Sequence, residues 1–129
     1  MPPIAQLQRV PLLLLQRLER QGVFTTGLLL EVSETRTRRQ TLADQIQVTT
    51  NDVNEWRDEA LLLNLAGFGL DEQRIFTQAG IVGLHDLLAL DRETFGARLD
   101  RAARTLGLDA PTAIAVDGWY AQARTLEEE

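Results

Sequence analysis

The stretch LAGFGLDEQR, residues 65–74, places two glycines one residue apart just before a run with helical character. Paired glycines let a chain turn sharply and expose backbone amides at the start of the next helix, where the amides can hold a phosphate. Here Asp71 and Glu72 occupy the first helical turn. Carboxylates at this position stabilise the helix dipole by about 0.3–1 kcal/mol each and repel a phosphate. We therefore expect a turn that packs helices, formed by Gly67, Phe68 and Gly69.

Composition narrows the classes of function. The 129 residues suit one ordinary domain or two very small ones. No cysteine is present, which excludes disulfides, thiolate nucleophiles and cysteine-ligated metals. All 13 basic residues are arginine, so lysine-dependent chemistry is also excluded. The 19 carboxylates bring the formal net charge to -6, and this acidic balance disfavours nucleic acid as a partner.

The chain carries no sign of a membrane segment. Its start, residues 1–4, lacks the charged and apolar blocks of a signal peptide. The longest apolar run, residues 10–15, is far shorter than the roughly 20 residues that span a bilayer. We expect no membrane association and a cytoplasmic location.

A weak internal duplication organises the sequence. With an offset of 58, residues 18–24 align with residues 76–82, and with an offset of 63, residues 53–56 align with residues 116–119. The second copy therefore has about five extra residues, and each copy ends in a helix that bears one tryptophan. This predicts two domains, a first copy with a degenerate hairpin over 1–64 and a second copy with the GFG hairpin over 65–129.

The periodicity is helical nearly throughout and predicts an all-α fold. Gly22 and Gly80 sit where a left-handed residue ends a helix, and Thr49, Asp91 and Asp109 sit where a side chain caps one. Pro11 should kink or split the first helix. The expected short helices are eight, at about 4–20, 26–32, 37–47, 50–64, 70–79, 83–89, 92–106 and 110–125.

The hairpin and its continuation resemble a known family. Residues 65–69 have the form hydrophobic-x-Gly-hydrophobic-Gly, Phe76 follows at the spacing for helix packing, and then come Ala79-Gly80-Ile81 and Asp86-Leu87-Leu88. At these residues the chain resembles the tandem helix-hairpin-helix-like bacterial family known as domain of unknown function 4332, in which a GIGP…AGI.T..DLL pattern recurs twice. The resemblance runs from about Pro11 to Arg124. It implies a compact pair of divergent four-helix units and no particular function.

The first copy departs from this pattern, because Arg9-Val10-Pro11 replaces its glycine pair. Residues 41–56 also keep the register of a helix-turn-helix, with Gln47 where glycine usually stands. Its second helix would present mainly carboxylates, which is the wrong sign for a DNA groove. Neither motif therefore predicts nucleic-acid binding.

Two arginine clusters are the better argument for a polyanion partner. One cluster precedes a predicted helix, and the other lies along one helix face at i, i+3, i+6. Carboxylates near both clusters favour a charge-balanced surface over a polyanion-binding one. Their members are Arg36, Arg38 and Arg39 in the first copy, and Arg98, Arg101 and Arg104 in the second.

Catalytic groups are scarce. Ser33 is the only serine and lies in a predicted loop, and His85 is the only histidine. We expect no enzyme, no cofactor and no metal site. Leucine runs at residues 12–15, 28–30 and 61–63 place apolar groups on more than one helix face, which needs another surface to cover them. We therefore expect a non-catalytic protein-interaction or assembly module that binds a protein partner or itself, with nucleic-acid binding through the arginine faces as the alternative.

Overall fold

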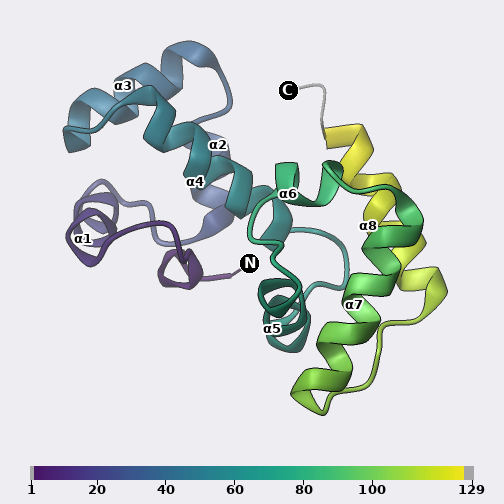
Figure 1. The fold of residues 1–129 in the computed structure, drawn as a ribbon. Coiled ribbons are helices and arrows are strands. Elements are labelled where there is room, and N and C mark those ends of the chain that lie inside the picture. Colours follow the sequence, from purple (N-terminus) through teal and green to yellow (C-terminus); the bar gives the residue numbers. More distant parts are fainter. Residues whose placement is uncertain (1, 127–129) are drawn as a thin grey trace. The chain divides into compact units, whose positions relative to one another are not determined.

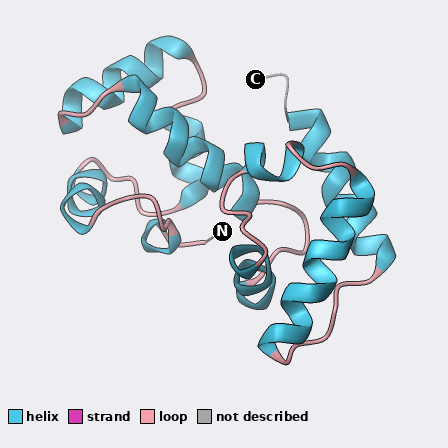
Figure 2. Cartoon of the chain, in the orientation of Figure 1, coloured by secondary structure: helices cyan, strands magenta, loops and turns pink. Residues whose placement is uncertain are grey.

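A computed structural model describes residues 2–126, and these residues confirm the all-α prediction (Figures 1 and 2). The chain divides into two compact units at Asn64 and Leu65. Residues 1 and 127–129, which the predicted copies include, lie outside the described residues. The first unit holds η1 (Ile4–Gln6), α1 (Leu12–Arg20), α2 (Thr26–Val32), α3 (Arg36–Ile46) and α4 (Thr50–Leu63). The second holds α5 (Leu70–Gln78), α6 (Leu84–Leu88), α7 (Arg92–Leu106) and α8 (Ala113–Leu126).

The first expected helix is split, as Pro11 predicted. A short 3-10 turn, η1, stands alone, and α1 begins only after Pro11, whose backbone is extended at ψ 153. The Pro11 carbonyl then accepts the amides of Leu14 and Leu15. Proline is tolerated here because the first turn of a helix has no partner for its amides.

Most predicted helix ends are confirmed. The side chains of Thr49 and Asp91 cap α4 and α7, and Gly22 and Gly80 adopt positive φ after α1 and α5. The prediction for Asp109 is wrong, because Thr112 accepts the Ala115 amide instead and α8 starts at Ala113. A proline disfavours helical backbone at the residue before it, so Pro111 delays the helix.

Helix α3 begins one residue earlier than expected. The Thr35 hydroxyl accepts the Arg38 amide, which places the first arginine cluster inside the first turn rather than before the helix. The helix ends at Gln47, which has left-handed backbone at φ 62. The chain thus makes the tight turn into α4 without the usual glycine.

Each unit has its own apolar core. In the first unit, α2 and α3 pack on α4, and in the second, α5 packs on α7 while α6 and α7 pack on α8. The side chains buried completely in the first core include Leu18, Leu29 and Ala60. Those of the second include Phe76, Leu87, Phe95 and Leu99.

Candidate functional site

The glycine hairpin of the second unit is a tight turn. Gly67 adopts φ +73, and the Phe68 amide donates to the Leu65 carbonyl over 3.1 Å. A left-handed residue of this kind strongly favours glycine. Gly69 is extended and forms the N-cap of α5. The chain therefore turns tightly at residues 65–69, directly before α5.

The backbone amide that could meet a phosphate is already bound. The Gly69 amide donates to Glu72 Oε1 over 2.9 Å, so the side chain at the third helical position satisfies the N-terminus of its own helix. Asp71 lies one residue away and within 3.9 Å of Arg74. Glu72 therefore occupies the anion position itself, which is a stronger reason against phosphate binding than repulsion alone.

Helix α8 clamps the hairpin from the other side. Trp119 Nε1 donates to the Ala66 carbonyl over 2.9 Å, and the Ala66 amide donates to Gln122 Oε1 over 3.0 Å. The Phe68 ring lies 4.8 Å from the ring of Phe76, edge to face. Both backbone polar groups of Ala66 are therefore hydrogen-bonded to side chains of α8, which attaches the turn to that helix.

In the first unit, the segment before Pro11 is held by a buried carboxylate. Glu59 is only 1% exposed, and its two oxygens accept the amides of Gln8 over 2.6 Å and of Arg9 over 3.0 Å. Burial raises the pKa of Glu59 above its ordinary value, although both amides and the Arg9 charge act in the opposite direction. Arg9 also forms an ion pair of 3.0 Å with Asp58.

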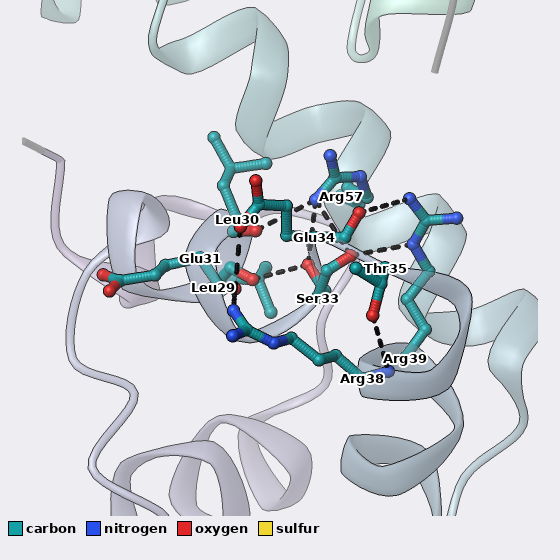
Figure 3. A network of polar contacts seen from close by, with 9 residues as sticks. All are labelled: Leu29, Leu30, Glu31, Ser33, Glu34, Thr35, Arg38, Arg39 and Arg57. Atoms are coloured by element: carbon teal, nitrogen blue, oxygen red, sulfur yellow. Dashed lines mark hydrogen bonds and ion pairs between the residues drawn. The ribbon is translucent and has the colours of Figure 1, made fainter.

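Two members of the first arginine cluster donate hydrogen bonds to backbone carbonyls at the C-terminal end of α2 (Figure 3). Arg38 donates to the Glu31 carbonyl over 3.0 Å, and Arg39 Nε donates to the Ser33 carbonyl over 2.8 Å. Arg57, from the neighbouring α4, donates to Ser33 as well, at both its carbonyl and its hydroxyl. Cations at a helix C-terminus offset its dipole and satisfy its free carbonyls. The cluster is thus structural at two of its three members.

The second arginine cluster is divided differently. Arg98 and Arg101 line one groove of about 250 Å³ in the second unit, together with Gln78, Ala79, Ala102 and Thr105. Arg104 does not line it. The helical spacing therefore brings two of the three predicted arginines to one place.

The only serine and the only histidine of the chain lie in different units. Ser33 lies in the turn between α2 and α3, as expected, but it is fully buried. Its hydroxyl donates to the Leu29 carbonyl and accepts from Arg57. His85 is exposed on the short helix α6. Within residues 2–126, no three Asp, Glu or His side chains are grouped so that they could hold a metal ion.

Sequence reasoning missed Glu59, Arg57 and the use made of Glu72. The Glu72 contact had a local signal, since a glutamate three residues after an N-cap is the spacing of a capping box. Glu59 stands directly before an apolar run, residues 60–63, and its burial is unusual for a glutamate. Its partner amides lie 50 and 51 residues away along the chain.

Large apolar side chains remain on the surface of both units. In the first they gather at the starts of α1 and α2, where Leu12 is 71% exposed, and they include Leu13, Phe24 and Leu28. In the second unit, Leu70 is 65% and Ile114 is 86% exposed. No helix in the described part of the chain is long and apolar enough to cross a membrane.

The fold and these contacts define an all-helical protein built from two compact units. A family described as a domain of unknown function (DUF4332) matches residues 14–126. The chain belongs to this family. No curated protein and no solved structure matches the chain.

Proposed function

We propose that the two units are divergent copies of one helix-hairpin-helix-like motif. Repeated contacts support this. Gln8 in the first unit and Ala66 in the second are 58 residues apart, and their amides donate to Glu59 and Gln122, which are 63 residues apart. These are the same two offsets that align the sequence with itself.

A second pair of contacts follows the same offset of 58. The Val23 amide donates to the Leu18 carbonyl, and the Ile81 amide donates to the Phe76 carbonyl. Both bonds span a glycine of positive φ that ends a helix. One ancestral turn accounts for both.

The function that we propose is that of a non-catalytic protein-interaction and assembly module. The observation that carries it is an exposed leucine at the first residue of the helix after each hairpin, Leu12 in α1 and Leu70 in α5. These positions also lie 58 residues apart. Nucleic-acid-binding hairpins present free amides and a cation there. In this chain the Gln8, Arg9 and Gly69 amides are bound by carboxylates, and the first side chain of the following helix is apolar.

An apolar residue at the tip of a hairpin gains free energy when another protein surface covers it. Full burial of a leucine contributes about 1.5–3 kcal/mol, which corresponds to roughly tenfold or more in affinity for each leucine. The partner that we propose is a second copy of the chain. Sedimentation velocity over a wide concentration range should therefore show self-association.

A variant with both Leu12→Gln and Leu70→Gln should sediment as a monomer. Ile114→Gln is the matched control, because Ile114 is more exposed than either leucine but follows no hairpin. It should associate like the unmodified chain. A chain that stays monomeric at every concentration, or an Ile114→Gln variant that also loses association, would contradict this function.

Nucleic-acid binding through the arginine faces is the second candidate. The observation that favours it is the exposed row Arg98, Arg101 and Arg104 on α7. Against it, residues 65–129 contain eleven carboxylates and only six arginines. Retention of the chain on a DNA or RNA probe that weakens with salt, and is lost in Arg98→Glu with Arg101→Glu, would favour it. No binding to any probe at low salt would eliminate it.

A further inference from the structure

The groove between α5 and α7 carries concentrated positive charge. Six residues line its volume of about 250 Å³: Gln78, Ala79, Arg98, Arg101, Ala102 and Thr105. Two of them are cations, and none is a carboxylate. The Arg98 guanidinium reaches the end of α5, where Nη1 lies 4.0 Å from the position that a Cβ on Gly80 would take.

These two arginines differ from Arg74 and Arg92 in the same unit. Arg74 lies 3.9 Å from Asp71, and Arg92 forms an ion pair with Asp117. Within residues 2–126, neither Arg98 nor Arg101 makes a hydrogen bond or an ion pair through its side chain. Their guanidinium donors are therefore available to a ligand.

The end of α5 does not neutralise this charge. A helix C-terminus carries about half a negative charge, and the two arginines carry two positive charges. About one and a half positive charges are left in the groove. Dipole compensation can explain one of the arginines but not both.

The first unit has a corresponding groove that is not free. Arg38 precedes the left-handed end of α3, Gln47, by nine residues, and Arg98 precedes the left-handed end of α7, Gly107, by nine residues. Arg38 also lines a groove, of about 310 Å³, but Glu31 lines it too and the Glu31 carbonyl accepts from Arg38. The charge of that groove is therefore compensated, whereas the groove between α5 and α7 has no acidic residue in its lining.

We propose that the groove lined by Arg98 and Arg101 binds the phosphate group of a small phosphorylated molecule. The planar guanidinium fork matches phosphate oxygens bidentately, and the Gln78 carboxamide adds a neutral donor. The volume holds a phosphate and a small attached group. The excess of carboxylates in this unit repels a long polyanion but acts less on a compact ligand seated between two arginines. This site does not depend on the leucine positions or on self-association.

Ligand titrations of the full chain test the proposal, with the arginine side-chain Nε–Hε signals observed by NMR. The ligands are inorganic phosphate, a sugar monophosphate and a DNA duplex. We expect saturable shifts at Arg98 and Arg101 with phosphate, and tighter binding of the sugar monophosphate. Arg98→Gln and Arg101→Gln should each weaken binding at least tenfold. Arg104→Gln is the control on the same helix and should bind as the unmodified chain does.

Four outcomes would overturn the proposal. One is a set of equal, non-saturating shifts at all exposed arginines, including Arg36. Another is a loss of binding in Arg104→Gln as large as that in Arg98→Gln. The third is tighter binding of the DNA duplex than of the sugar monophosphate, which would assign the arginines to nucleic acid. If inorganic phosphate binds as tightly as the sugar monophosphate, the site is one for the free ion and the assignment to a phosphorylated molecule is wrong.

Discussion

The buried carboxylate of Glu59 provides the sharpest test of how the first unit is held together. Glu59→Ala removes the acceptor of two backbone amides, those of Gln8 and Arg9. Leaving a buried donor without a partner costs about 1–3 kcal/mol. Both amides are only partly buried, so we expect a loss of about 2–4 kcal/mol in the free energy of unfolding at pH 7. For a unit of this size that loss is a large part of the total stability.

Glu59→Gln should behave differently from Glu59→Ala. A carboxamide keeps one acceptor oxygen, and Gln122 already uses one to accept the Ala66 amide in the second unit. The substitution Glu59→Gln also removes a buried charge. We therefore expect this variant to lie within about 1 kcal/mol of the unmodified chain at pH 7.

The contribution of Glu59 to the free energy of unfolding depends on pH with a definite sign. Burial raises the pKa of Glu59 in the folded state above its unfolded value of 4.5, so the folded state binds the proton more tightly. The contribution of Glu59 to stability is then largest below pH 4.5 and falls as the pH rises through the folded pKa. Each unit of difference between the two pKa values contributes about 1.4 kcal/mol. As the pH is lowered from 7 to 4.5, the unmodified chain should gain stability relative to Glu59→Gln.

The assay is urea unfolding followed by the fluorescence of Trp56, which lies in the same helix as Glu59. All variants carry Trp119→Phe, so that only the first unit is observed. Hydrogen exchange at the Gln8 and Arg9 amides gives a second readout, and it should accelerate in Glu59→Ala. Equal stability of the Ala and Gln variants, or a relative loss of stability in the unmodified chain at low pH, would refute this account of Glu59.

Two further predictions concern the hairpin and α8. Gly67→Ala should destabilise the second unit by about 1–2 kcal/mol because Gly67 has φ +73, whereas Gly118→Ala, in the open middle of α8, should stabilise it by up to about 1 kcal/mol. Thermal unfolding by circular dichroism measures both, and a shift of the same sign in the two variants would contradict the reasoning. Trp119→Phe should cost about 1–3 kcal/mol, because the Ala66 carbonyl loses its donor. Hydrogen exchange should accelerate at the Ala66 amide and not at the Leu108 amide, and unchanged exchange at Ala66 would show that the clamp does not hold the hairpin.

Much of the fold could be predicted because its signals are local. Gly22 and Gly80 end helices through their own backbone conformation, and Thr49 caps through an amide three residues away. Asp109 misled the prediction, since a capping side chain is only useful where the helix can start, and Pro111 moved that point. Signals that lie within about four residues of their effect were therefore mostly sufficient.

The candidate site was predicted less well because its contacts are distant in sequence. The spacing of Arg98 and Arg101 placed them on one helix face, but Gln78 and Ala79 come from another helix. The roles of Arg38 and Arg39 depend on carbonyls at the end of α2, and that of Arg57 on residues 24 and 27 positions away. The sequence does not show which arginines meet the carbonyls of another helix, because those carbonyls are distant along the chain.

The arginines of the two units differ in their hydrogen bonds, and the contacts of Arg57 suit an arginine better than a lysine. In the first unit one nitrogen of Arg57 meets the Leu30 carbonyl and both oxygens of Ser33, a set of acceptors that a planar, weakly hydrated guanidinium satisfies at low desolvation cost. The second unit has no such task for Arg98 and Arg101 among its described residues. If the units are copies, they differ at one corresponding arginine: Arg38 donates to the Glu31 carbonyl, whereas Arg98 makes no side-chain hydrogen bond or ion pair among the described residues. The groove between α5 and α7 is the place where we propose that a ligand uses this difference.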